Sequence, residues 1–213
     1  KDFFYVKIFL ELGHIPAEKM KKVAAVINNF REGTIRSTHD QNLVLRWIHK
    51  SELKVLYDKL KNIGLNRPGA KTVQNITCCT GASTCRPGIC LSRGLTTAIF
   101  EIFKKENEII QSIDNLKINI SGCPNACGQD PIGQIGLYGV ARRVGGRMVP
   151  HYMITLGGRV EEGKTVLGEK IAMAPSKDMP SIILKFLKDF KLNGKKADFY
   201  EYIENGGKNV LKG

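Results

Sequence analysis

The chain has 213 residues, of which 42% are hydrophobic, and it carries a formal charge of +13. That length is enough to bury one sizeable core or two smaller ones. No apolar run approaches the roughly 20 residues that span a bilayer, and the first residues do not read as a signal peptide, so we expect no membrane partner.

The positive charge would attract anions such as nucleic acid, acidic proteins or a polycarboxylate ligand. The lysines, however, spread over the polar faces of the predicted helices. The sequence contains neither a run of five basic residues nor an aromatic platform motif of the RNA-binding type. We therefore expect no nucleic-acid partner.

The first 66 residues predict a compact α+β lobe. Pro16 opens its first helix and Gly33 follows that helix, whereas Ser51 caps the second helix and Gly64 closes it. The expected elements, in chain order, are a strand over residues 3–12, a helix over 16–30, extended segments at 34–37 and 42–49, and a helix over 52–63.

Residues 66–71, Asn-Arg-Pro-Gly-Ala-Lys, form the natural joint, so we expect one domain over 1–66 and a larger one over 72–213. The larger domain again mixes strands and helices, which makes the whole chain α+β. Its expected elements are a strand over 72–77, a helix over 92–107, a strand over 116–120, an antiparallel pair at 132–140 and 151–156, a helix from 178 or 180 to 190, and a last helix over 197–204.

Four of the six cysteines stand in two short loops, each placed after a predicted strand. The loops read Cys79-Thr-Gly-Ala-Ser-Thr-Cys85 and Cys123-Pro-Asn-Ala-Cys127. Four thiolates from two loops are what a cubane iron–sulfur cluster needs, one for each iron. Glycine and proline in these loops leave backbone amides free to point at cluster sulfurs, which tunes the reduction potential. The pattern predicts a redox protein.

A four-cysteine zinc site is the main structural alternative. Zinc sites favour two to four residues between paired cysteines, and the five residues between Cys79 and Cys85 exceed that. The remaining cysteines, Cys78 and Cys90, are interpreted as small buried residues. Six clustered cysteines indicate metal binding in a reducing, cytoplasmic compartment rather than a disulfide scaffold.

The cysteine loops resemble those of the siroheme-containing nitrite and sulfite reductases. The stretch Thr77-Cys78-Cys79-Thr80-Gly81 looks like the family's first cluster loop, and residues 121–129, Ser-Gly-Cys-Pro-Asn-Ala-Cys-Gly-Gln, are close to its most recognisable motif. Similar segments follow at residues 133–139 and 156–159, and residues 33–43 resemble the preceding lobe. The resemblance covers nearly the whole chain.

The resemblance implies a small ferredoxin-like lobe followed by a larger mixed-sheet 4Fe-4S domain with helices packed on it. Cys79, Cys85, Cys123 and Cys127 would hold a [4Fe-4S] cluster, and Cys127 would also bridge it to the iron of siroheme. Asn125 and the arginines Arg93, Arg142 and Arg143 would contact this cofactor, since arginine pairs bidentately with carboxylates.

The implied activity is the six-electron reduction of nitrite to ammonia or of sulfite to sulfide. The electron donor would be a ferredoxin or a flavoprotein. Family members have two pseudo-symmetric halves, and this chain resembles the second, cluster-bearing half, so we assign no residue to the substrate anion. The chain would be an excised domain, which its start at Lys1 without methionine favours, a subunit that needs a partner, or a single-half enzyme that dimerises.

Two other classes of function remain as alternatives. An iron–sulfur electron-transfer domain without siroheme would keep the four cysteines but would not need the Gly-Cys-Pro-Asn stretch or the downstream Leu-Gly-Gly. A zinc-bound module acting on nucleic acid would show a concentrated basic face and salt-dependent binding, which the dispersed lysines do not indicate.

Overall fold

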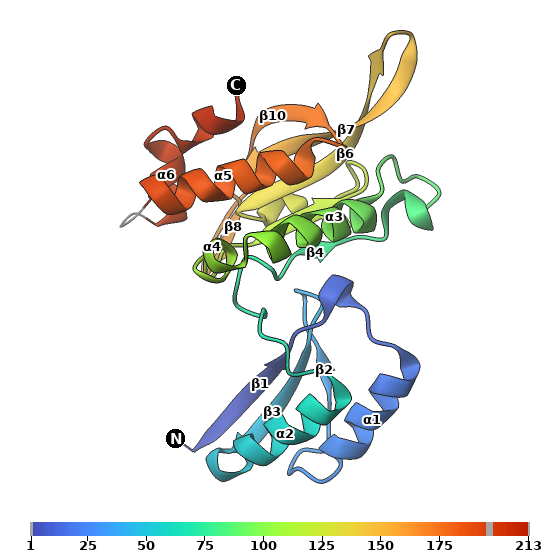
Figure 1. Ribbon diagram of the computed structural model, residues 1–213, viewed down its shortest axis with the longest axis vertical. Helices are drawn as coiled ribbons and strands as arrows, with labels where there is room; N and C mark the ends of the chain where they lie inside the picture. The colour runs from blue at the N-terminus through green and yellow to red at the C-terminus, as the bar shows by residue number, and fades with distance from the viewer. Residues whose placement is uncertain (1, 195–197, 213) are drawn as a thin grey trace. The chain divides into compact units, whose positions relative to one another are not determined.

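The computed structural model describes residues 2–194 and 198–212. The chain divides into two compact units, residues 1–70 and 71–213 (Figure 1). Within the described residues, no helix is both long enough and apolar enough to cross a membrane.

The first unit is a three-stranded antiparallel sheet in the order β1-β3-β2, with two helices that share its core. Its elements are β1 (Phe3–Ile8), α1 (Ala17–Ile27), β2 (Arg36–Ser37), β3 (Leu43–His49) and α2 (Leu53–Ile63). Alternating strand residues such as Leu43 and Leu45 meet helix residues such as Val23, Ile27 and Leu56 in one buried cluster. The apolar residues that recur at helical and strand intervals in the sequence therefore pack into one core.

The first strand ends earlier than the sequence predicts. It stops at Ile8 because the chain turns into a 3-10 segment, Glu11–Gly13, in which Leu12 has a φ of 58°. The backbone N–H of Leu10 donates to the side chain of Asn42 at 2.9 Å, so a side chain replaces the ladder partner there.

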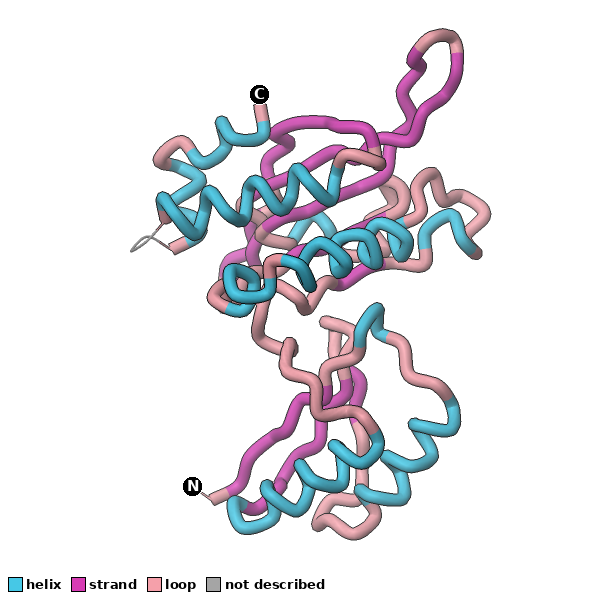
Figure 2. Tube along the Cα trace, viewed as in Figure 1, coloured by secondary structure: helices cyan, strands magenta, loops and turns pink. Residues whose placement is uncertain are grey.

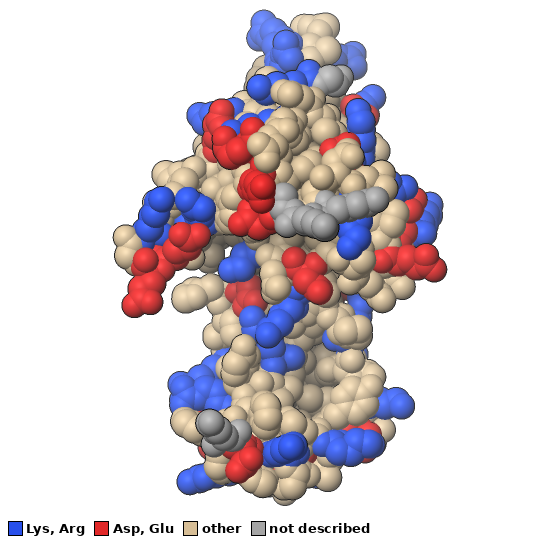
Figure 3. Space-filling view, turned by 90° about the vertical axis from the view of Figure 1, so that its left-hand side faces the viewer, with Lys and Arg blue, Asp and Glu red and all other residues tan. Residues whose placement is uncertain are grey.

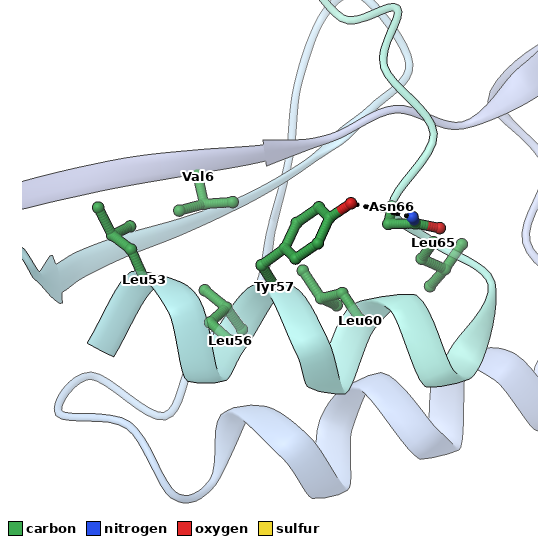
Figure 4. A pocket seen from close by; sticks show the side chains of 7 residues that line it. All are labelled: Val6, Leu53, Leu56, Tyr57, Leu60, Leu65 and Asn66. Atoms are coloured by element: carbon green, nitrogen blue, oxygen red, sulfur yellow. Dashed lines mark hydrogen bonds between the residues drawn. The ribbon is translucent and has the colours of Figure 1, made fainter. Parts of the chain in front are cut away.

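An apolar groove of about 310 Å³ lies beside α2 in this unit (Figure 4). The Asn66 side chain donates to the Tyr57 hydroxyl at 3.4 Å at one end of the groove. Its lining residues are Val6, Leu53, Leu56, Tyr57, Leu60, Leu65 and Asn66.

The second unit is built on a five-stranded mixed sheet in the order β10-β7-β6-β5-β4. Strands β4, β5 and β6 run parallel, whereas β7 is antiparallel to both β6 and β10. The strands are β4 (Thr77–Cys78), β5 (Ile118–Ser121), β6 (Ile135–Val144), β7 (Arg147–Leu156) and β10 (Glu169–Pro175), with a separate hairpin of β8 (Arg159–Glu161) and β9 (Lys164–Val166).

Two helices cover one face of this sheet (Figure 1). Helix α3 (Ser92–Lys105) packs against β4 and β5, and α5 (Met179–Asn193) lies beside α3. Apolar residues such as Ile120, Leu137 and Ile154 are paired across neighbouring strands, so they share a face and form a buried layer. Shorter helices α4 (Asn107–Gln111) and α6 (Phe199–Glu204) complete the unit.

Several sequence-based boundaries were wrong in this unit. Only residues 77 and 78 of the region around the expected strand 72–77 pair as a strand, with Thr72 making an isolated bridge to Asp114. The predicted pair at 132–140 and 151–156 is a longer hairpin whose strands meet near the Gly145-Gly146 turn, and β8, β9 and β10 were not predicted. The last helix begins at Phe199, and its expected start at residue 197 lies outside the described residues.

Candidate metal centre

The two cysteine loops leave the same edge of the sheet. Strands β4 and β5 are parallel, with Cys78 paired to Ile120, so their carboxyl ends lie side by side. Cys79 follows β4 directly, and its N–H donates to the carbonyl of Ile120 at 3.0 Å. Cys123 follows β5 by one residue, Gly122. Two cysteines separated by 44 positions in the sequence are therefore delivered to one place.

Backbone contacts join the loops at Gly122. Its N–H donates to Sγ of Cys79 at 3.1 Å, and its carbonyl accepts from the N–H groups of Ile89 and Cys90 at 2.9 and 2.8 Å. A Cβ at Gly122 would lie 2.7 Å from the Cα of Gly81, which no side chain tolerates. Glycine at 81 and 122 therefore permits the close approach of the loops.

The second loop folds over the sheet face that carries Asn119 and Ser121. The Ser121 hydroxyl accepts from the Gly128 N–H at 2.9 Å, and the Asn119 amide donates to the carbonyls of Gly128 and Gln129 at 3.2 and 3.0 Å. Ala126 adopts a φ of 57° within the loop. These bonds hold the segment that presents Cys127.

The four predicted ligands differ in exposure. Cys123 is buried, Cys79 and Cys85 are half-buried, and Cys127 is exposed. In the described part of the chain, no three His, Cys, Asp or Glu side chains are grouped to hold a single metal ion. A cubane cluster places each thiolate on a different iron, and two loops that meet at Gly122, with an amide directed at the Cys79 sulfur, fit that group.

The other two cysteines are buried and belong to the packing under the loops. Burial raises the pKa of Cys78, whereas the Thr96 hydroxyl and the Arg93 guanidinium lower it. Burial also raises the pKa of Cys90 to about 11, and its Sγ donates to the carbonyl of His151 at 3.3 Å. Both groups are therefore neutral thiols at physiological pH.

The predicted cofactor-contacting residues fall in three places. Arg93 is half-buried on the first turn of α3, and Asn125 is exposed in the second cysteine loop. Arg142 and Arg143 are exposed near the tip of the β6–β7 hairpin, which continues beyond the sheet (Figure 2). Because β5 and β6 are parallel, this hairpin leaves the sheet at the edge that also carries the second cysteine loop.

Consecutive strand residues point to opposite faces, so Arg142 and Arg143 do not serve the same side of the hairpin. Tyr138 pairs with Ser121, and Arg142 is in phase with Tyr138 on β6. Arg142 therefore belongs to the face over which Gly128 and its loop fold, whereas Arg143 belongs to the helix-covered face.

Other residues of the site were not predicted from the sequence. Ile89 and Leu91 beside Cys90 are large apolar residues that are 37% and 57% exposed, which offers an apolar surface next to the cysteine loops. Ser92 and Tyr152 are fully buried near the cysteines. No sequence signal distinguishes these residues from ordinary core or surface positions. Tyr152 is remote from both cysteine loops in the sequence, and the other three are common residue types with no motif of their own.

Comparison with known proteins places both units in one family. Residues 1–63 match the nitrite/sulfite reductase ferredoxin-like half domain, and residues 69–210 match the nitrite and sulphite reductase 4Fe-4S domain. The ferredoxin–nitrite reductase of Synechococcus elongatus is 27% identical over 86% of this chain, which spans 35% of that protein's length.

Solved structures show the same fold. The NirA protein of Mycobacterium tuberculosis has a TM-score of 0.79 at 23% identity, covering 97% of this chain and 39% of the NirA chain. Dissimilatory sulfite reductase I has a TM-score of 0.71 at 12% identity, covering 99% of this chain and 68% of the other. With both of its domain models matched, this chain belongs to the nitrite and sulfite reductase family.

Proposed function

We propose that this chain is the cluster-bearing half of a siroheme-dependent nitrite or sulfite reductase. One observation carries the proposal: two cysteine loops leave neighbouring parallel strands and meet where Gly122 N–H donates to Sγ of Cys79. The chain spans about a third of the length of the nitrite reductase it matches, and we propose the complete activity only for an assembly that contains this chain.

Cys79, Cys85, Cys123 and Cys127 would hold the four irons of the cluster. We propose that Cys127, which is exposed, would also ligate the iron of siroheme. The bound cofactors would relay electrons from the donor and would supply an open iron for nitrite or sulfite. The protein positions these groups and keeps the Cys79 sulfur hydrogen-bonded to a backbone amide.

Cationic groups on the β6–β7 hairpin and apolar groups beside the first cysteine loop suit a flat polycarboxylate such as siroheme. Arg142 follows the face over which the Cys127 loop folds, and exposed Ile89 and Leu91 provide apolar surface. We propose Arg142 as the principal carboxylate partner, with Arg143, Arg93 and Asn125 as further contacts.

The complete site would need a second set of residues. We propose that another half, in the same protein or in a separate subunit, supplies the groups that bind the substrate anion. The relatives include ferredoxin-dependent nitrite reductases, and a net charge of +13 suits an acidic donor such as a ferredoxin or a flavoprotein. Six cysteines without a disulfide fit a reducing, cytoplasmic setting.

The test is an anaerobic purification from cells that make siroheme, followed by optical spectroscopy and by quantification of iron and acid-labile sulfide. Four irons and four sulfides beyond the haem iron are expected per chain. Single serine substitutions of Cys79, Cys85, Cys123 and Cys127 should lower the cluster content, whereas Cys78→Ser and Cys90→Ser are matched controls that should retain it.

Two outcomes would change the proposal. A brown protein with full cluster content and no haem bands would support the iron–sulfur electron-transfer domain without siroheme. Zinc in place of iron would refute both the reductase proposal and the iron–sulfur electron-transfer alternative. If the haem spectrum is present, nitrite and sulfite turnover with reduced ferredoxin would distinguish the substrates.

A further inference from the structure

Ser92, the first residue of α3, lies where the two cysteine loops meet. Its side chain is fully buried, and its hydroxyl donates to the backbone carbonyl of Cys79 at 2.8 Å. The same hydroxyl lies 3.3 Å from Sγ of Cys79, a distance at which either atom is able to donate. Ser92 is therefore in contact with both the backbone and the sulfur of one predicted ligand.

The space around this hydroxyl is created by two glycines. A Cβ at Gly81 would overlap Oγ of Ser92, and a Cβ at Gly122 would lie 3.5 Å from it. Gly81 belongs to the first cysteine loop and Gly122 precedes the second. The hydroxyl thus fills the point at which both loops pass the start of α3.

Whether the Ser92 hydroxyl donates to the Cys79 sulfur depends on which of the two groups carries a proton. Ser92 has one hydroxyl proton, and the free Cys79 thiol has one of its own. A cysteine that ligates iron is a thiolate, which only accepts hydrogen bonds. The amide of Gly122 already donates to this sulfur at 3.1 Å, so the Ser92 hydroxyl is the second donor within reach.

We propose that Ser92 is a positioning residue of the cluster, whose hydroxyl hydrogen-bonds the iron-bound sulfur of Cys79 and raises the cluster's reduction potential. This inference rests on the proposed function, because it requires a cluster on Cys79. A hydrogen bond to an anionic acceptor is stronger than one to a neutral carbonyl, which favours turning the proton toward the sulfur.

The direction of the effect follows from charge. Reduction adds negative charge to the cluster and its thiolates, and a hydrogen-bond donor stabilises that charge more in the reduced state than in the oxidised state. Removal of the donor should therefore lower the midpoint potential. It should not change the number of irons bound, since Ser92 is not itself a ligand in this proposal.

The experiment compares the full chain with three variants after anaerobic reconstitution with iron and sulfide, without siroheme. Ser92→Ala removes the hydroxyl, Ser92→Thr retains it, and Thr96→Val removes another buried hydroxyl of α3, which donates to the Ser92 carbonyl. Iron and sulfide content, the EPR spectrum of the reduced state and the midpoint potential are measured for each.

Full cluster content with a lower potential in Ser92→Ala, and near-wild-type potentials in Ser92→Thr and Thr96→Val, would support the proposal. An unchanged potential in a fully loaded Ser92→Ala chain would overturn it and leave the proposed function intact. A wild-type chain that takes up no cluster would instead refute the proposed function, and this inference with it.

If Ser92→Ala loses the cluster, its potential cannot be measured, and proton ENDOR spectra of the reduced wild-type and Ser92→Thr chains provide the test instead. A coupling that disappears within minutes in D2O is expected in both, because a hydroxyl proton exchanges faster than the buried Gly122 amide. Its absence from the wild type would overturn the proposal.

Discussion

The backbone N–H of Gly122 donates to Sγ of Cys79 at 3.1 Å, although 43 positions separate the two residues in the sequence. This bond connects the second cysteine loop to the first predicted ligand. It depends on the parallel pairing of β4 with β5, which brings the ends of both strands to one edge. The register of two short strands therefore determines the geometry of the candidate metal centre.

Gly139 on β6 should be intolerant of a side chain. A Cβ there would overlap the Gly122 carbonyl and lie 2.9 Å from the Cβ of Cys90, and backbone atoms cannot move aside as a flexible side chain would. We expect Gly139→Ala to lower the free energy of unfolding by about 1–3 kcal/mol and to reduce cluster content, measured by denaturant titration and iron analysis.

Gly94→Ala on α3 is the matched control. Gly94 is exposed, and its added Cβ would meet only the Cβ of Leu91, at 3.4 Å. Replacing glycine in a helix should increase the stability by about 0.5–1 kcal/mol. Equal stability of the two variants would show that the Gly139–Gly122 contact does not constrain the fold.

Asp130 should make the stability of the chain depend on pH. The residue is 3% exposed, and its Oδ1 has no hydrogen-bond partner in the described part of the chain. Burial raises the pKa of this carboxyl, with a smaller opposing effect from the Ser121 hydroxyl. A raised folded-state pKa means that the unfolded chain loses the proton first as pH rises.

Wild-type stability should therefore fall, relative to Asp130→Asn, as pH rises from about 4 through the folded-state pKa. The asparagine variant cannot ionise, so its stability relative to the wild type should be greater at pH 7 than at pH 4. Denaturant titration at several pH values measures the difference. If the wild type instead became more stable relative to Asp130→Asn as pH rises, the folded protein would favour the ionised form of Asp130, and the prediction would be wrong. Glu108→Gln, on the exposed surface of α4, serves as the control.

Cys90 should affect stability at alkaline pH. Burial raises its pKa from 9.0 to about 11, so between these values the unfolded chain releases a proton that the folded chain retains. The difference in stability between the wild type and Cys90→Ala should therefore shift against the wild type by about 2 kcal/mol between pH 9 and 11. Denaturant titration across this range measures the shift, and a constant difference would contradict a buried neutral thiol.

Arg142 and Arg143 should contribute unequally to siroheme retention. Lys and Arg atoms gather, on the face shown in Figure 3, at the end of the second unit where Figure 1 places the hairpin. Arg142 is in phase with Tyr138, whose partner Ser121 holds the Cys127 loop through Gly128. We expect Arg142→Gln to release siroheme at least about tenfold more readily than Arg143→Gln, because a charged contact to a carboxylate contributes about 1.5–3 kcal/mol.

The ratio of haem to iron–sulfur absorbance after gel filtration measures this retention. Arg143→Gln is the matched control, since it removes the same charge from the opposite face of the hairpin. A larger loss from Arg143→Gln would place siroheme on the helix-covered side of the loops and contradict the assignment of Arg142.

The sequence alone determined the fold class and the two cysteine loops, because spacing, glycine content and periodicity are local properties of the chain. The resemblance of those loops to the nitrite and sulfite reductases indicated the family. Helices α1, α2, α3 and α5 were predicted within a few residues, since apolar residues recur there at helical intervals. Strand β10 was not predicted, because its burial is partial and its partner β7 lies elsewhere in the sequence.

Only the tertiary structure decided which groups surround the predicted ligands. Ser92 is an ordinary helix-start residue in the sequence, and its contact with Cys79 exists because Gly81 and Gly122 allow two loops to cross there. Arg142 and Arg143 are neighbours that any strand places on opposite faces, and the pairing of β6 with β5 decides which face each one takes. Such relationships depend on long-range strand register, which no local pattern encodes.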